Sequence, residues 1–264
     1  HVRSRRQRQM CIRDREGRAT PARVPGPFWY FRNALSSDEP DHSRYREVIE
    51  DALSILTAAR THTVVDEYVR ELMAEPAARG RSDLVADLAF RLPLVLLNRA
   101  FGLDDTQGEQ LVGLMRQVWD GGAEAEAAMG GLFGYAQSVT LQRREEPGDD
   151  VVSRMILHGN GLDDEEVAHQ LILIISAAHD PLMNLIANTL HALLTDRGSR
   201  ADVMSGNARV EELVDIVLWK APPIFLMPGR YPARSMELEG WTVGEGDCLI
   251  MGYGPAHALS LIHI

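Results

Sequence analysis

The sequence predicts a mainly α-helical domain with a small β subdomain near its C-terminal end. Apolar residues recur at the 3.6-residue spacing of amphipathic helices from about residue 41 to residue 220. After that, RYPARSMELEGWTVGEGDCLIMGY alternates short apolar runs with glycine-containing turns, as short strands do. We find no internal repeat and no low-complexity linker, which favours one domain.

Two of the predicted helices have recognisable signals at their N-terminal ends. The first follows a proline and starts with Asp41, which is favourable chemistry for a helix N-terminus. The longest follows the acidic run DDEE and extends to Thr195, roughly 48 Å at 1.5 Å per residue. Its apolar residues point to all sides, so we expect it to pass through the centre of the domain. The predicted helices cover 41–57, 64–73, 83–101, 106–119, 123–144, 149–157, 164–195 and 210–219.

Composition and charge limit the classes of protein and of binding partner that this sequence allows. With 264 residues, 45% hydrophobic and 25% charged, the chain has a globular composition. Its net charge of −11 argues against nucleic acid as a partner, because phosphate binding needs clustered Lys and Arg. The two cysteines are too few for a disulfide framework, which indicates a cytoplasmic location. Polar residues interrupt Leu171–Leu190 before the roughly 18 apolar residues of a span are reached, so no membrane is expected.

The two ends of the chain differ from the rest. Residues 1–23 contain eight Arg against two acidic residues. Both MCIRDR near the start and LSLIHI at the end resemble translated sequencing-adapter read-through. We therefore interpret residues 1–23 as a non-native or disordered segment, 24–257 as a partial domain and 258–264 as a non-native tail. A native basic disordered tail is the alternative for the first segment.

Two groups of polar residues are candidates for a site. His42 and Arg46 are spaced i,i+4, so they share a helix face and can grip a carboxylate together. An ordinary solvated helix face is the alternative. Arg230 in GRYPA is a third candidate, with an exposed loop arginine as its alternative.

The second group is the stretch ISAAHDPLMNL inside the longest helix. Ala177 and Ala178 thin the helix, so that a flat group can approach its backbone, and Asp180 is costly to bury without a polar role. Pro181 removes one helix hydrogen bond, at roughly 3 kcal/mol in an ordinary helix. Together these residues predict a kink in the longest helix beside a cavity. The alternative is a helix break packed against a loop, with His179 hydrogen-bonded by a neighbour.

Four segments, taken in order, resemble the bacterial cytochrome P-450 family: EPDHSRYR, RSDLVADLAFRLPLVLLNRAFGL, LDDEEVAHQLILIISAAHDPLMNLIANTLHALL and GRYPARSMELEGWTVGEGD. The resemblance covers about residues 27–257. It implies a partial cytochrome P-450 fold, from about the C helix to the strands after the K helix. It also implies heme b, with His42, Arg46 and Arg230 contacting the propionates.

The activity implied by this resemblance is that of a heme-thiolate monooxygenase, an oxidoreductase. Such an enzyme receives electrons from a ferredoxin-type donor and inserts one oxygen atom of dioxygen into an apolar small molecule. In the family, the long helix carries an oxygen groove with the pattern small-small-x-acid-Thr. Ala177 and Ala178 match the small pair and Asp180 matches the acid, while Pro181 stands at the usual Thr position. Loss of the alcohol removes one proton donor.

A second departure lies in DIVLWKAPP, which resembles the K helix. The family has a buried Glu-x-x-Arg ion pair there, and Ile216 and Trp219 stand at those places. Replacing both partners by apolar residues can be neutral or stabilising. The other match to Glu-x-x-Arg, Glu67 with Arg70, is predicted to be a surface pair. These departures resemble an atypical subgroup of the family.

The resemblance does not supply an axial ligand for the heme iron within this chain. The family's axial cysteine lies in a Gly-rich loop beyond the strand region, so the axial thiolate is expected to be absent from this chain. Cys248 is predicted to be a partly buried strand cysteine, and the histidines show no metal-binding spacing. A monooxygenase and a non-catalytic heme-fold protein with a binding or partner role both remain open. A helical regulator without heme would require the propionate anchors to be coincidental.

Overall fold

The computed structural model describes residues 10–11, 31–232 and 234–258. The chain divides into two compact units. One comprises His1–Glu47 with Ile224–Ile264, and the other is Val48–Pro223. The boundary at residue 47 lies inside helix α2 (Asp41–Leu53). The domain boundaries predicted from the sequence stay predictions, and most of the segment 1–23 lies outside the described residues.

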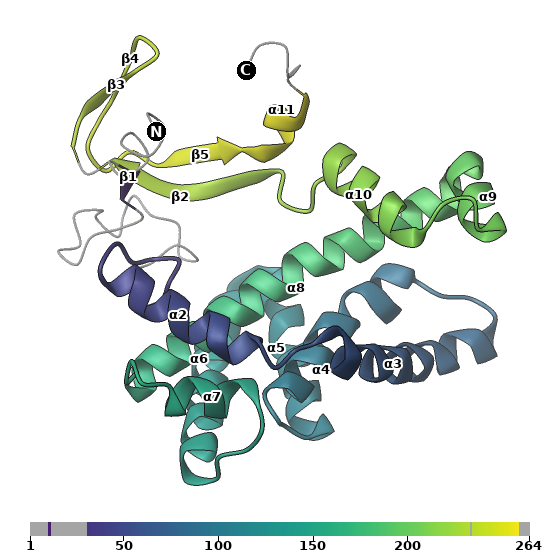
Figure 1. Ribbon diagram of the computed structural model, residues 1–264, viewed down its shortest axis with the longest axis horizontal. Helices are drawn as coiled ribbons and strands as arrows, with labels where there is room; N and C mark the ends of the chain where they lie inside the picture. The colour runs from purple at the N-terminus through teal and green to yellow at the C-terminus, as the bar shows by residue number, and fades with distance from the viewer. Residues whose placement is uncertain (1–9, 12–30, 233, 259–264) are drawn as a thin grey trace. The chain divides into compact units, whose positions relative to one another are not determined.

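The Val48–Pro223 unit is helical, as predicted (Figure 1). Besides the second part of α2 it contains α3 (Ala58–Arg79), the π-helix η2 (Val85–Ala89), α4 (Arg91–Ala100), α5 (Asp105–Asp120), α6 (Ala123–Glu145), α7 (Val151–Leu157), α8 (Asp164–Thr195), α9 (Arg197–Ser205) and α10 (Val210–Lys220). Helix α9 was not predicted from the sequence, and α3 is longer than predicted at both ends.

Helix α8 begins with a capping box, in which side chains replace two missing helix hydrogen bonds. Asp163 Oδ1 accepts a bond from the Glu166 amide at 2.8 Å, and Glu166 Oε2 accepts one from the Asp163 amide at 3.0 Å. The helix packs against η2, α4, α6, α7, α9 and α10. Figure 1 shows it as the long helix that connects the α6–α7 region to α9 and α10. Leu171 and Ile175 are at most 1% exposed, which confirms its predicted role as a core helix.

The predicted helix 83–101 is divided between η2 and α4. The Phe90 amide donates to the Val85 carbonyl at 2.8 Å, which is the i→i+5 bond of a π-turn. Pro93 in the first turn of α4 has no N–H for the Ala89 carbonyl. A uniform α-helix through this segment would therefore lack a bond, which explains why the hydrogen-bond register changes just before Pro93.

The other unit contains the strands. β1 (Met10–Cys11), β2 (Leu226–Pro232) and β5 (Leu249–Gly252) form an antiparallel sheet in the order β1-β2-β5, and β3 (Met236–Leu238) pairs with β4 (Trp241–Val243). A short helix, α11 (Tyr253–Ala258), follows β5. The β2–β5 register shifts between Met227 and Arg230, and Gly229 has φ 101° at this shift, a conformation that a side chain would disfavour.

Candidate active site

Residues 176–181 lie in the middle of α8, and Pro181 is inside the helix. One continuous α-helix passes through this proline, so the alternative of a helix break is wrong. Pro181 still has no N–H to donate to the Ala177 carbonyl. Ala177 is exposed, so solvent can reach this turn and reduce the cost of the missing bond.

His179 is fully buried and is held by a neighbouring helix. Its Nε2 lies 3.1 Å from the Phe90 carbonyl oxygen, and its ring makes edge-to-face contacts with Phe90 and Trp119, with centroids 4.8 and 6.5 Å apart. Because a carbonyl can only accept, Nε2 carries the proton. Burial lowers the pKa of His179 below its ordinary value, more than the Phe90 bond and Asp180 raise it. The expectation that a neighbour satisfies His179 is met at Nε2 only, because the buried Nδ1 has no hydrogen-bond partner within the described residues.

Asp180 is half-buried on a different face of α8. Its Oδ1 accepts a bond of 2.8 Å from Asn184 Nδ2, which also donates to the Asp180 carbonyl at 3.0 Å. Burial raises the pKa of Asp180, while His179 and the Asn184 bond partly offset this. A carboxyl with a raised pKa binds and releases protons closer to neutral pH than an exposed one. Sequence reasoning missed Asn184, although its i,i+4 spacing from Asp180 was visible.

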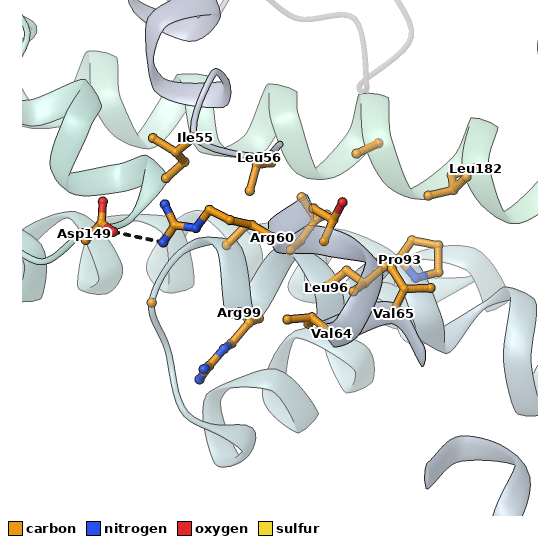
Figure 2. A pocket seen from close by; sticks show the side chains of 15 residues that line it. Ile55, Leu56, Arg60, Val64, Val65, Pro93, Leu96, Arg99, Asp149 and Leu182 are labelled. Carbon is orange, nitrogen blue, oxygen red and sulfur yellow. Dashed lines mark hydrogen bonds and ion pairs between the residues drawn. The ribbon is translucent and has the colours of Figure 1, made fainter. Parts of the chain in front are cut away.

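A cavity of about 520 Å³ lies beside the same part of α8 (Figure 2). Ala178 and Leu182 contribute its α8 wall, and the other walls come from residues 55–65, from α4 and from Gly102 and Asp149. Successive helix residues are about 100° apart, so Asp180 projects about 200° away from Ala178. The cavity therefore lies on the face of α8 away from Asp180. Ala178 lines this cavity and Ala177 does not, and the cofactor contacts expected of the two alanines stay a prediction.

The three predicted anchors belong to the unit that carries the sheet. The His42 ring donates from Nδ1 to the Ala34 carbonyl at 2.8 Å, which fixes the ring on α2. Arg46 is exposed one turn further along α2, and Arg230 is half-buried on β2, opposite Leu249. None of the three lines the cavity beside α8. Their convergence on a space bordered by Ala177 and Ala178 stays a prediction.

The two residues that stand where the family has the ion pair of the K helix lie on α10. Ile216 is 47% exposed and Trp219 is 52% exposed, so neither apolar side chain fills a core within the described residues. The second Glu-x-x-Arg match is on the surface as predicted, but its partners are different. Arg70 pairs with Asp66 at 2.7 Å, because i,i+4 spacing brings these two side chains together.

Cys248 differs from the prediction. It is exposed and lies just before β5, whereas a partly buried strand cysteine was expected. The segment that joins β4 to β5 extends through Cys248, because β5 begins only at Leu249. Within residues 10–11, 31–232 and 234–258, no group of three His, Cys, Asp or Glu side chains could hold a metal ion.

Helix α8 also meets the length and hydropathy of a membrane span. An 18-residue window has mean hydropathy 1.4, and 39% of that window is buried. The expectation that no segment would qualify is wrong by this measure, because the few polar residues from His179 to Asn184 are outweighed by Leu and Ile. A core helix of a globular protein passes the same test, and α8 packs against six neighbouring elements.

No family model matches the chain. Among curated proteins, the chain is 26% identical over 240 residues to the cytochrome P450 monooxygenase PikC of Streptomyces venezuelae, covering 85% of this chain and 56% of that protein. It is 25% identical to the vitamin D(3) 25-hydroxylase of Pseudonocardia autotrophica, covering 83% and 56%. The chain thus spans little more than half the length of these relatives.

A solved structure with a similar fold is also a cytochrome P450. The structure of CYP154A1 from Streptomyces coelicolor A3(2) superposes with a TM-score of 0.79 at 23% identity, covering 95% of this chain and 67% of that one. The predicted fold class is therefore confirmed: the order of helices and late strands is that of a cytochrome P450.

Proposed function

The sequence relatives of this chain are bacterial cytochrome P450s and its fold is theirs, and from this premise we propose that it is part of a heme-thiolate monooxygenase that oxidises an apolar small molecule. The observation that carries the proposal is the middle of α8. There a half-buried carboxyl, held by Asn184, follows two alanines within a continuous helix. A core helix otherwise has no reason to bury part of an acid.

The donor set fits heme b. Heme presents two propionate carboxylates, and His42, Arg46 and Arg230 are donors that can hold them. His42 and Arg46 share a face of α2, and Arg230 is half-buried at the β-bulge. Bound heme would supply the activation of dioxygen. The exposed Cys248 is poorly suited to ligate its iron, so the axial thiolate would come from elsewhere in the protein.

Asp180 is proposed to hold and deliver protons. Asn184 fixes one oxygen of its carboxyl, which leaves the other to exchange protons with water. Pro181 cannot donate the hydrogen bond that a threonine would supply, so we expect poor coupling of electrons to product. Pro181→Thr in the active protein should lower hydrogen peroxide released per reducing equivalent. An unchanged leak would show that the proline does not limit coupling.

The partners follow from the same proposal. The enzyme needs an external electron donor of the ferredoxin type, and its substrate is an apolar small molecule. We propose a cytoplasmic location and no nucleic-acid or membrane partner. The net charge of −11 supports the exclusion of nucleic acid.

A non-catalytic heme-fold protein is the second candidate, and one observation favours it. The proton-donating alcohol and the ion pair of the K helix are both absent, with Pro181, Ile216 and Trp219 at those positions. Oxygen uptake with a ferredoxin donor and without substrate separates the two, because only a monooxygenase draws electrons to dioxygen.

Heme binding is tested with the 264-residue chain. Titration with hemin should give a Soret band, and the single variants His42→Ala, Arg46→Ala and Arg230→Ala should each weaken binding about tenfold, as expected for loss of a charge-assisted hydrogen bond. Arg209→Ala, which removes an exposed arginine on the helical unit, is the matched control. If all four variants bind hemin alike, the anchors are wrong. After reduction and addition of carbon monoxide, no thiolate-type band is expected.

A further inference from the structure

We propose that His179 is a positioning residue, which sets the direction in which the next residue, Asp180, presents its carboxyl. Both residues and their contacts lie in the Val48–Pro223 unit. The His179 ring is fully buried, so its role does not depend on which surfaces of the chain are free. The inference rests on the proton role proposed for Asp180, and it names the neighbour that holds the carboxyl in place for that role.

The His179 ring makes one hydrogen bond within the described residues. Nε2 donates to the Phe90 carbonyl at 3.1 Å, and the buried Nδ1 has no partner there. The rings of Phe90 and Trp119 contact the imidazole edge-to-face and fill the space around it. A hydrogen bond is more directional than such packing, because it weakens steeply when its angle closes. The Nε2 bond is therefore the contact that best defines how α8 is rotated against Phe90.

This bond joins two places where a helix lacks part of its own hydrogen-bond pattern. In α8, Pro181 has no N–H for the Ala177 carbonyl. On the other side, the Phe90 amide makes the i→i+5 bond of a π-turn, and Pro93 in the first turn of α4 also lacks an N–H. Backbone with fewer helix bonds of its own opens more easily. The bond from His179 to Phe90 therefore has a larger influence here than between two regular helices.

Asp180 depends on this bond through the helix. It follows His179 directly and lies about 100° further round α8, so a rotation of α8 at His179 also moves the Asp180 carboxyl. Asn184 bonds Oδ1 of that carboxyl but lies on the same helix, so it cannot fix the carboxyl relative to neighbouring elements. The bond to Phe90 can. Catalytic groups must be held within roughly 0.5 Å of their productive position, so a small rotation is enough to disturb proton delivery.

The variants His179→Gln and His179→Met test the positioning in the 264-residue chain. Gln and Met have similar lengths and are both neutral, but only Gln can donate to the Phe90 carbonyl. A pH titration of the Asp180 carboxyl carbon by NMR, with the signal assigned by Asp180→Asn, measures its pKa. Burial is the main cause that raises this pKa. A carboxyl that turns toward water should therefore show a lower pKa in His179→Met than in His179→Gln.

Leu171→Ala is the control for lost stability. It removes a fully buried side chain about two turns earlier on α8 and leaves the bond to Phe90 in place. The pKa of Asp180 should then equal that of the original chain. An equal pKa in His179→Gln and His179→Met, or an equally large change in Leu171→Ala, would overturn the proposal. If His179→Met does not fold, as judged by far-UV circular dichroism, His179→Phe takes its place, because it keeps a ring without a donor.

A second measurement connects the positioning to the proposed activity. In the active protein, His179→Met should lower kcat about tenfold and change KM less than about twofold, because proton delivery is affected and substrate binding is not. His179→Gln should recover most of kcat. A lower pKa of Asp180 with an unchanged kcat would support the positioning and contradict the proton role of Asp180. A loss of kcat that His179→Gln does not reverse would count against the proposal, since the ring and not its bond would then be needed.

Discussion

The two halves of α8 have similar apolar composition but very different surroundings. In residues 164–175, Val167, Leu171 and Ile175 are at most 1% exposed. In residues 176–195, Leu182 is 38% exposed and Leu194 is 59% exposed. Helix α8 packs against α6 and α7 among other helices, and Ala178 and Leu182 of its second half line the cavity. The comparison teaches that an apolar sequence allows a helix to be buried, but the neighbouring elements decide which part of the helix is buried.

The first half should therefore carry most of the stability. Leu171→Ala removes a fully buried side chain and should lower the free energy of unfolding by about 2–5 kcal/mol, through lost apolar contact and the cavity left behind. Leu194→Ala makes the same chemical change in the exposed half and should cost less than about 0.5 kcal/mol. Urea unfolding followed by circular dichroism measures both. Equal losses would contradict the difference between the halves.

In the second half, Pro181 leaves one backbone hydrogen bond of the helix unmade, and a substitution can restore it. Pro181→Ala restores the N–H that can donate to the Ala177 carbonyl and should raise the free energy of unfolding by about 1–3 kcal/mol. The same urea titration gives the value. Pro76→Ala in α3 is a useful control, since it tests whether any helix proline behaves this way. A loss of stability in Pro181→Ala would mean that the neighbours of α8 require the proline ring.

The start of the first half depends on its capping box. Asp163→Ala removes the acceptor for the Glu166 amide and should lower stability by about 1 kcal/mol. Asp163→Asn keeps an acceptor at this position and should recover most of that loss. Thermal unfolding of both variants measures the difference. If Asp163→Asn is no better than Asp163→Ala, the cap does not act through this hydrogen bond.

The smallest effect concerns His179. Burial lowers its pKa in the folded state below the ordinary value of about 6.5. As the pH falls below that value the unfolded chain takes up a proton that the folded chain refuses, so stability decreases toward acid pH. We expect the thermal midpoint to fall by a few degrees between neutral and mildly acidic pH, and this slope to be reduced in His179→Gln. Identical slopes would show that the ring is solvated.

The sequence predicted the elements whose signals are local. Capping residues and periodicity located α8 at 164–195, as the structure has it. The division of the predicted helix at η2 was missed, because a π-turn depends on where the Ala89 carbonyl finds a donor. Sequence reasoning found Asp180 by its cost of burial but missed Asn184. It also could not foresee that Ala178 and Ala177 face different surroundings, because that depends on which helices pack against α8.

One contact on α2 decides which edge of the His42 ring can meet a ligand. The Nδ1–H of His42 is already committed to the Ala34 carbonyl, so Nε2 alone is left to meet a ligand. A carboxylate held by His42 would therefore approach the ring from the side away from Ala34.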